Sequence, residues 1–377
     1  MGSLHLDEIR LTHVRVPLVE PFVISNGAVS EKDAILVELA GEGLTGLGEA
    51  SPMAGAFYSH HTPESSWAAL TGRMVPRLGE LGTVSLDGRW AEGLLDDPFA
   101  VAGIDLALWD LAARAAGAPL WSLLGGDGSR PLESGLAVGI VESTEALLER
   151  IDRHLAADGY RRVKIKVQPG WDVRPLEGVR GRFPALPLMV DANGAYGREH
   201  IEALAGWDRF GLMMIEQPLP REDLEGHALL AGRCRTPICL DESAETVTDV
   251  ERALALKSAR IINVKLQRVG TLAAARRIHD LARDAGAGCW MGTMPELGVG
   301  AFAAMHFATL PNIRYPTDVE ASRRWFVADV TRPPVACSNG LLSLPGSAGL
   351  GVQLDGEAVE RYRVRRWSAR LNCALTF

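Results

Sequence analysis

The chain has 377 residues, of which 47% are apolar and 23% charged, and its formal net charge is −8. This composition is typical of a globular enzyme, and the length suits one large barrel with a smaller second domain. The acidic balance, without a basic stripe, argues against a nucleic-acid partner. No apolar run reaches the length of a membrane span.

Cysteine usage and the first residues bear on the cellular compartment. The five cysteines are odd in number and show no C-x-x-C spacing, so neither a disulfide framework nor a zinc site is predicted. The opening MGSLHLDEIR carries acidic residues and lacks the apolar core of a signal peptide. We therefore expect a cytoplasmic protein with free thiols, and we expect it to form a homo-oligomer.

The first 50 residues predict strands, with a glycine-containing hairpin turn at 41–43. Two loops with apolar side chains, 21–27 and 51–61, are as consistent with lids that dry a site as with plain packing. A helix follows over 101–115, where apolar residues recur at helical spacing. Asp105 and Asp110 lie within it, and we expect them to be surface or capping charges.

From residue 133 onward, predicted strands and helices alternate in seven or eight βα units, the number that closes a barrel. The Pro- and Gly-rich tail cannot form another such unit. We therefore predict an α/β protein with a modified (β/α)8 barrel, of (β/α)7β type, over residues 128–325. Residues 1–127 would form an α+β capping domain, to which residues 326–377 would return.

Charged residues recur every 24 or 25 positions, each at or near the end of a short run rich in Val and Ile. These residues are Lys166, Asp191, Glu216, Asp241 and Lys265. Because a strand, a turn and a helix take roughly 25 residues, this interval returns each charge to the same end of successive strands. The carboxyl ends of barrel strands carry the chemistry of barrel enzymes, so the five side chains should converge on one mouth.

Asp191, Glu216 and Asp241 offer three hard anionic ligands from adjacent strand ends. Such oxygens suit Mg²⁺, with Mn²⁺ or another divalent ion as alternatives, whereas the absence of His at these strand ends disfavours zinc. Helix capping or salt bridging would explain one such residue, but three at a constant interval favour a metal site.

Lys166 and Lys265 flank the three acids in barrel order, which favours a catalytic over a structural role. An ordinary lysine, with a pKa of about 10.4, is a poor base at neutral pH, and nearby positive charge lowers that pKa. Lys164 lies two residues from Lys166 on the same strand, so its charge faces the same side. Lysines on opposite faces of an α-carbon next to a metal-bound carboxylate would allow racemisation or dehydration through a stabilised enediolate.

Several segments resemble the enolase superfamily, and the resemblance covers nearly the whole chain. They are GIDLALWDLAARAAGAPLWSLLGG, DANGAY, EQPL, DES, NVKLQRVG and GLGVQLD. Lys164-Ile165-Lys166 is similar to the Lys-x-Lys strand of the muconate-lactonizing subgroup. MGTMPELGVG, LPNI and PTDVEASRRWFVADV resemble the o-succinylbenzoate synthase and N-succinylamino acid racemase family.

This resemblance implies that Lys166 and Lys265 are the acid/base pair and that the three acids bind Mg²⁺. Arg268 matches the branch that contains the racemases, and the loops around Phe22 and Phe57 would close over the succinyl end. The residues implied to contact substrate are Lys164, Asn193, Arg268, Phe22, Phe57, Gly292, Thr293, Met294 and Asp318. Two positions depart from the family pattern: Ala137 stands where a small hydroxyl residue is common, and Glu320 replaces a small residue.

The expected function is therefore Mg²⁺-dependent o-succinylbenzoate synthesis, N-succinylamino acid racemisation, or both, acting on a small carboxylate. A dipeptide epimerase or a muconate-type cycloisomerase of the same subgroup is the alternative, and Asp318 and Glu320 could then hold an α-ammonium group. A barrel that binds a metal or ligand without catalysis is the alternative of a different class. The two retained lysines argue against it.

Overall fold

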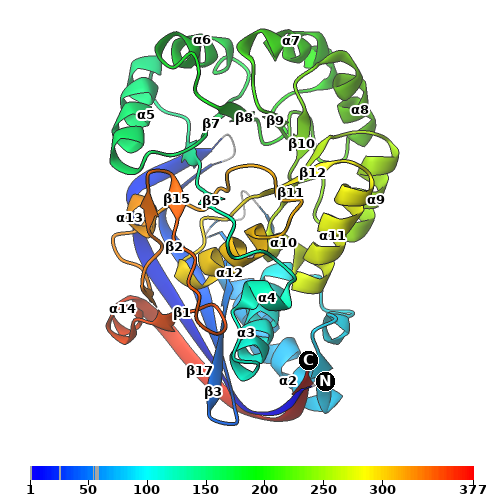
Figure 1. The fold of residues 1–377 in the computed structure, drawn as a ribbon, viewed down its shortest axis with the longest axis vertical. Helices are drawn as coiled ribbons and strands as arrows, with labels where there is room; N and C mark the ends of the chain where they lie inside the picture. The colour runs from blue at the N-terminus through cyan, green and yellow to red at the C-terminus, as the bar shows by residue number, and fades with distance from the viewer. Residues whose placement is uncertain (1, 25–26, 54, 56–58) are drawn as a thin grey trace.

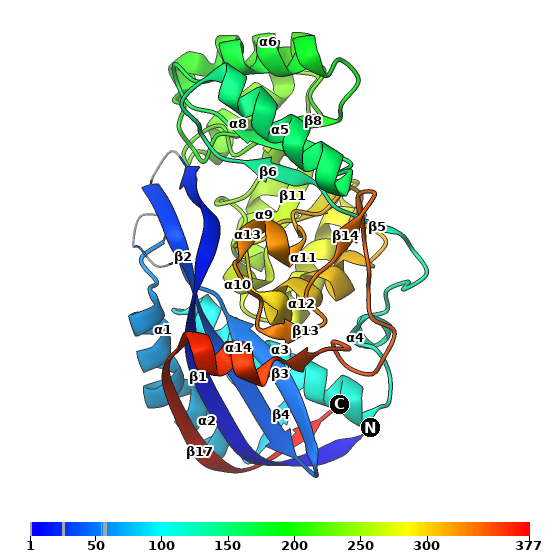
Figure 2. The same ribbon diagram turned by 90° about the vertical axis from the view of Figure 1, so that its left-hand side faces the viewer.

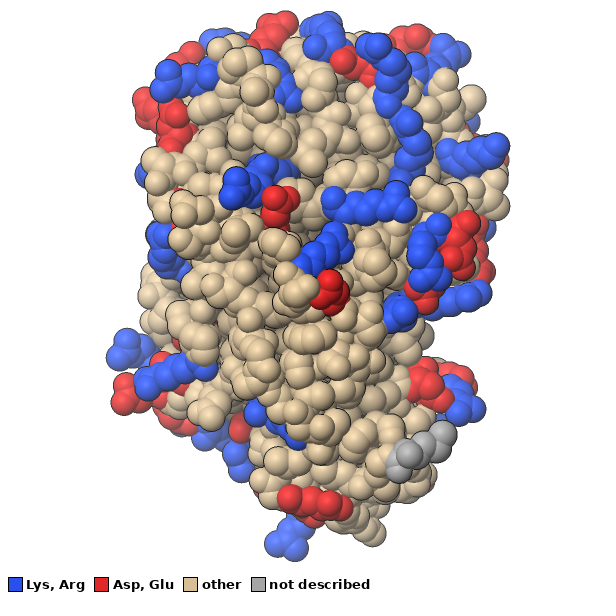
Figure 3. All heavy atoms as spheres, viewed as in Figure 1, with Lys and Arg blue, Asp and Glu red and all other residues tan. Residues whose placement is uncertain are grey.

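The computed structural model describes residues 2–24, 27–53, 55 and 59–377. It contains a five-stranded sheet and a seven-stranded parallel sheet, each covered by helices (Figure 1). Acidic and basic side chains are interspersed on the face shown in Figure 3. Within the described residues, no helix is both long and apolar enough to cross a membrane.

The five-stranded sheet joins the two ends of the chain. Its strands, in order, are β3 (Leu44–Ala50), β2 (Gly27–Gly41), β1 (Ser3–Ile24), β17 (Arg363–Thr376) and β4 (Thr83–Ser85). The C-terminal strand β17 lies antiparallel to β1 and parallel to β4, so the last residues are an inner strand of this sheet. The long strands β1 and β2 reach up to the barrel (Figure 2), where Leu18 forms a bridge with Phe326.

Helices α1 (Pro63–Ala69), α2 (Val75–Leu81) and α3 (Pro98–Ala115) accompany this sheet. Helix α3 packs so closely on β3 that a Cβ atom on Gly48 would collide with the backbone of Gly103. The expectation of surface charges is wrong for Asp105 and Asp110, because both are buried, whereas Asp105 does cap the first amide of the helix Leu272–Asp284. They accept hydrogen bonds from backbone amides of distant segments, Asp105 from Leu272 and Asp110 from Leu47 and Leu350.

The seven-stranded sheet is parallel and curls into a barrel. Its strands are β12 (Gly288–Met291), β11 (Ile261–Val264), β10 (Ile238–Leu240), β9 (Ile215–Glu216), β8 (Leu188–Asp191), β7 (Val163–Lys166) and β6 (Leu136–Val138). The segment 313–317 closes the barrel, because Ile313 forms a parallel bridge with Cys289 and Thr317 forms one with Ser134. The (β/α)7β architecture predicted from the repeat is confirmed.

Helices lie between the strands, and most of them cover the outside of the barrel (Figure 1). They are α5 (Thr144–Asp158), α6 (Val173–Arg182), α7 (Ile201–Ala205), α8 (Leu224–Arg233), α9 (Val247–Ala255), α10 (Leu266–Val269), α11 (Leu272–Asp284) and α12 (Gly298–Ala308). Helix α12 is buried along its whole length, and its first turn meets β3 of the five-stranded sheet. The described chain therefore packs the barrel mouth against that sheet through this helix.

Residues after the barrel form short elements before β17. Helix α13 (Ser322–Trp325) leads to the paired strands β13 (Thr331–Arg332) and β16 (Gln353–Leu354). Strands β14 (Cys337–Ser338) and β15 (Leu341–Leu342) join β5 (Leu132–Glu133). Helix α14 (Gly356–Tyr362) then turns the chain into β17.

Candidate active site

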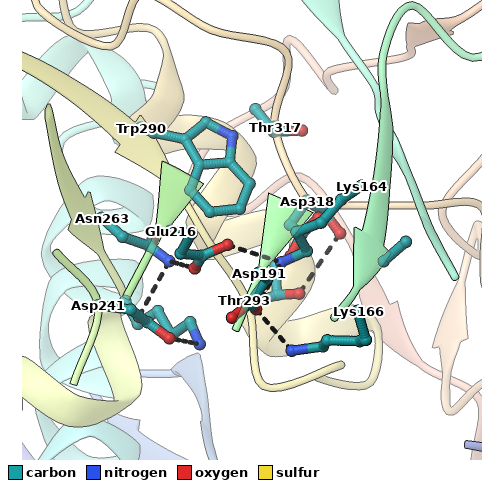
Figure 4. Close-up of polar contacts among 12 residues, drawn as sticks. Lys164, Lys166, Asp191, Glu216, Asp241, Asn263, Trp290, Thr293, Thr317 and Asp318 are labelled. Atoms are coloured by element: carbon teal, nitrogen blue, oxygen red, sulfur yellow. Dashed lines mark hydrogen bonds and ion pairs between the residues drawn. The ribbon is translucent and has the colours of Figure 1, made fainter. Parts of the chain in front are cut away.

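The strand register places the predicted charges side by side. Lys166 on β7 is level with Asp191 on β8, and Asp191 is level with Glu216 on β9. In-register residues of parallel strands point to the same face, so the three side chains enter the barrel interior together (Figure 4). Residues spaced 25 apart in the sequence therefore lie in a row across neighbouring strands.

An apolar layer lies inside the barrel beneath this row. Four of its members each lie two residues before a polar site residue in the chain: Met189, Met214, Cys239 and Ile261. The fifth is Trp290, which pairs with Asn263 on the neighbouring strand. All five are fully buried. The polar site therefore lies against a buried apolar layer, where electrostatic interactions are stronger than in water.

Asn263 connects two of the three acids. Its Nδ2 atom donates to Oε1 of Glu216 over 2.7 Å and to Oδ1 of Asp241 over 2.9 Å. Lys265, two residues later, donates from Nζ to Oδ2 of Asp241 over 2.8 Å, and Arg268 pairs with the same carboxylate. Burial raises the pKa of Asp241, but these two cations outweigh it and leave that pKa below its usual range.

Lys164 lies at the centre of the acidic groups. Its Nζ atom is 2.5 Å from Oδ2 of Asp318, 3.4 Å from Oε2 of Glu216 and 3.7 Å from Oδ2 of Asp191. The ammonium also sits over the Trp290 ring, 4.7 Å from its centre. Burial alone would lower the pKa of Lys164, but the surrounding carboxylates raise it. Lys164 is therefore a fixed positive charge.

Lys166 is held by two groups. Its Nζ atom donates to Oδ2 of Asp191 over 2.5 Å and to Oδ1 of Asn193 over 2.8 Å. The Asn193 amide then donates to Oε1 of Glu242 over 2.9 Å. Burial, with help from Asp241 and Asp191, raises the pKa of Glu242 to about 7. This chain of contacts orients the amine that faces the cavity.

The donor set fits a hard divalent cation. Asp191, Glu216 and Asp241 provide carboxylate oxygens, and within the described part of the chain Oε2 of Glu216 is buried without a hydrogen-bond partner. Burial and the Asp191 charge raise the pKa of Glu216 well above its usual range, as expected for acids that need a shared counter-charge. Among the described residues no group has the spacing of a formed metal site, because lysines pair with the acids. Cation binding would displace those ammonium groups.

A cavity opens above the row. Its charged lining consists of Lys164, Lys166, Lys265 and Asp318. Its other lining residues are Phe22, Met53, Ala137, Thr293, Met294, Pro295 and Trp325. Phe22 meets Trp325 edge to face, with ring centres 4.9 Å apart, so a residue of the N-terminal sheet forms part of the cavity wall.

Three predicted contact residues, Gly292, Asn193 and Arg268, are not among the residues that line this cavity. Phe57 is outside the described residues. Gly292 packs against Asn263, whose amide a Cβ atom at that position would hit. Asn193 and Arg268 contact Lys166 and Asp241 rather than the cavity wall. Sequence reasoning missed Asn263, although its position two residues before Lys265, within the apolar run that leads to it, was a usable signal.

Comparison with known proteins gives the class to which this arrangement belongs. Residues 7–125 match the mandelate racemase/muconate lactonizing enzyme N-terminal domain, and residues 146–359 match the enolase C-terminal domain-like family. The chain therefore belongs to the enolase superfamily, which confirms the resemblance noted in the sequence. Enzymes of this superfamily generally depend on a divalent metal.

Individual proteins of this superfamily are similar to the chain over nearly its whole length. The chain is 40% identical to an o-succinylbenzoate synthase of Geobacillus kaustophilus, over 96% of each protein. It is 37% identical to an N-succinylamino acid racemase of Thermus thermophilus, over 95% of this chain and 97% of that protein. A crystal structure of an enolase-superfamily member from Listeria innocua superposes with a TM-score of 0.92 at 33% identity, covering 98% of this chain and 100% of that one.

Proposed function

We propose that this protein is a Mg²⁺-dependent o-succinylbenzoate synthase, an N-succinylamino acid racemase, or both, acting on a small carboxylate substrate. The proposal rests chiefly on one observation. Lys166 and Lys265 line the same cavity from the two ends of the row formed by Asp191, Glu216 and Asp241. Two amines that approach one cavity from different strands can each serve a different face of a substrate.

The two lysines would carry the proton transfers. One amine, in its neutral form, takes the proton from the α-carbon of the bound carboxylate and becomes an ammonium group. A proton returned by the other amine to the opposite face gives racemisation. If an ammonium group instead gives its proton to a departing β-hydroxyl group, water leaves and dehydration results.

The remaining site residues would bind the substrate and the metal ion and would stabilise negative charge on the substrate. Lys164, a permanent cation, attracts the substrate carboxylate, and Asn193 orients the Lys166 amine. Asp191, Glu216 and Asp241 would hold Mg²⁺, and a bound cation would stabilise the negative charge that builds on the carboxylate as the α-proton leaves. Phe22, Met53 and Trp325 exclude water from this step by covering the cavity with apolar surface.

A dipeptide epimerase is the second candidate within the subgroup. Its support is a crystal structure of a dipeptide epimerase from Cytophaga hutchinsonii in complex with Mg and a dipeptide. It superposes with a TM-score of 0.87 at 25% identity, over 97% of this chain and 99% of that one. The carboxylates that would take an α-ammonium group are engaged, however. Asp318 pairs with Lys164 and Arg162, and Glu320 accepts from the backbone amide of Ala137. This favours an acyl group over a free amine.

The test is exchange of the α-proton in deuterated solvent with Mg²⁺ and N-succinyl amino acids. The wild-type protein should incorporate deuterium at the α-carbon, and a Lys166→Ala/Lys265→Ala variant should not. A wild type that binds Mg²⁺ but exchanges no carboxylate of a broad panel would favour a binding protein without catalysis. We also propose the domain division: a capping domain of residues 1–127 and 326–377, and a barrel of residues 128–325. The same proposal includes a homo-oligomer in the cytoplasm.

A further inference from the structure

Lysine is rare in this chain, and its positions are selective. Lys and Arg together number 39, yet lysine occurs at 32, 164, 166, 257 and 265 alone. Lys257 is exposed, whereas the other four are buried. Three of those four belong to the site described above. A buried lysine lowers stability unless its charge is paired or hydrogen-bonded, so the burial of the fourth, Lys32, needs an explanation.

Lys32 lies on β2 and joins two parts of the fold that are far apart in sequence. Its Nζ atom donates to the carbonyl oxygen of Ser51 over 3.2 Å and to that of Met294 over 3.3 Å. Ser51 is the first residue after β3, and Met294 lies in the loop between β12 and α12. One ammonium group therefore ties the N-terminal sheet to a loop at the barrel mouth.

Both tied segments form the apolar wall of the cavity. Met53 follows Ser51 by two residues, and its side chain packs in one cluster with Met294 and Phe99. Gln267 supports the same junction, because it donates to the carbonyl oxygen of Glu49 over 2.8 Å and accepts from the amide of Ser51 over 2.9 Å. The junction thus lies two residues from Lys265 in the chain.

Two buried carboxylates complete the junction. Glu49 accepts from the backbone amides of Leu297 and Gly300 at the start of α12, each over 2.8 Å. Glu296 accepts from the amide of Met294 over 3.0 Å, while its second oxygen is buried and has no hydrogen-bond partner among the described residues. Burial lowers the pKa of Lys32, and the charges of Glu49 and Glu296 oppose that shift. The ammonium group therefore lies near the acids that hold the loop in place, and the opposite charges favour each other.

A second cavity places Lys32 next to the site. Its lining includes Lys32 between the acidic Glu31 and Asp33. Five further lining residues also line the first cavity: Phe22, Met53, Met294, Pro295 and Trp325. The two cavities therefore share a wall, and Lys32 stands behind it. Any change in the position of Met53 relative to Met294 alters both spaces.

We propose that Lys32 is a positioning residue that fixes the spacing of Met53 and Met294 and thereby sets which acyl groups the site accepts. It touches no reacting atom. It acts by holding the carbonyl groups of Ser51 and Met294 on one ammonium. The identity of the acyl end rests on the proposed function, but the mechanical role of Lys32 does not.

The test compares Lys32→Met with Lys32→Arg and with the control Lys257→Met, which removes the exposed lysine. Substrates are the N-succinyl and N-acetyl derivatives of one amino acid, followed by α-proton exchange. In Lys32→Met, KM for the succinyl substrate should rise roughly tenfold, the size of a one-methylene misfit in an apolar pocket, while kcat falls less than threefold. Lys32→Arg should recover most of the loss, because its donors reach the same carbonyl groups. Equal effects on both substrates, or a fall confined to kcat, would overturn the proposal.

A second readout does not depend on activity. Backbone hydrogen exchange should accelerate in Lys32→Met in peptides covering 49–53 and 293–300, and stay at the wild-type rate in peptides from β8 and β9. The double variant Lys32→Met/Glu296→Gln, which removes the acid left without its cation, guards against failure to fold. Unchanged protection of both peptides in a folded variant overturns the positioning role even if the wild type proves to have another activity. Absence of α-proton exchange in the wild type across a broad panel of carboxylates would reject the proposed function alone.

Discussion

Lys164 donates to Asp318 over 2.5 Å, although the two residues are 154 positions apart in the chain. The same carboxylate lies 2.8 Å from the Arg162 guanidinium, and all three side chains are buried. Asp318 follows the segment that closes the barrel, so this ion pair joins the closing segment to β7. The contact links the two sides of the barrel closure. It also pairs the Asp318 carboxylate, which would otherwise be available to attract a substrate ammonium group.

The Asp318→Asn variant should be markedly less stable. It would leave Arg162 and Lys164 buried with less counter-charge, and breaking such a pair costs about 3–5 kcal/mol. The free energy of unfolding from urea titration measures this loss. The control Asp152→Asn breaks the exposed pair with Arg182 and should cost no more than about 1 kcal/mol. Similar values for the two variants would contradict a stabilising role of the Asp318 pair.

The contribution of Asp318 should disappear in acid. Burial opposes ionisation, but Lys164 and Arg162 outweigh it and lower the pKa of Asp318 to about 2, from an ordinary value of about 4. A lowered pKa in the folded state stabilises the fold above the unfolded-state value and is lost as the pH falls toward the folded-state value. The stability difference between wild type and Asp318→Asn should therefore be constant above about pH 5 and shrink between about pH 4 and pH 2. A difference independent of pH across urea titrations at these values would reject this linkage.

Divalent-cation binding should depend on Glu216. The Glu216→Gln substitution removes one anionic ligand and should weaken Mn²⁺ or Mg²⁺ binding by at least about tenfold, measured by calorimetry without substrate. The control Glu245→Gln alters an acid that pairs with Arg221 on the surface and should leave the affinity at the wild-type value. Equal affinities for all three proteins would place the cation elsewhere.

Substrate preference should separate the two candidates within the subgroup. Because Asp318 and Glu320 are engaged by Lys164 and Arg324, a free α-ammonium group finds no unpaired acid at that position. The ratio kcat/KM should therefore be larger for N-succinyl amino acids than for dipeptides. Faster turnover of dipeptides by the wild type would favour an epimerase.

The sequence predicted the site where geometry follows from a repeat. Parallel strands of similar length bring every twenty-fifth residue to the same edge, and Lys166, Asp191 and Glu216 accordingly stand in register. The burial of Asp105 and Asp110 was not predicted, because periodicity describes one helix face and α3 is covered on nearly all sides. The partners of Lys32 and Asp318 were not predictable, since they lie 262 and 154 residues away.

The central claim is that Lys166 and Lys265 act on opposite faces of one α-carbon. Its most direct test is deuterium exchange followed separately for the two enantiomers of an N-succinyl amino acid, with Mg²⁺, in Lys166→Ala and Lys265→Ala. We predict that each variant exchanges a single enantiomer, that the two variants exchange opposite ones, and that neither racemises. Exchange of both enantiomers at the wild-type rate in either variant would contradict the account.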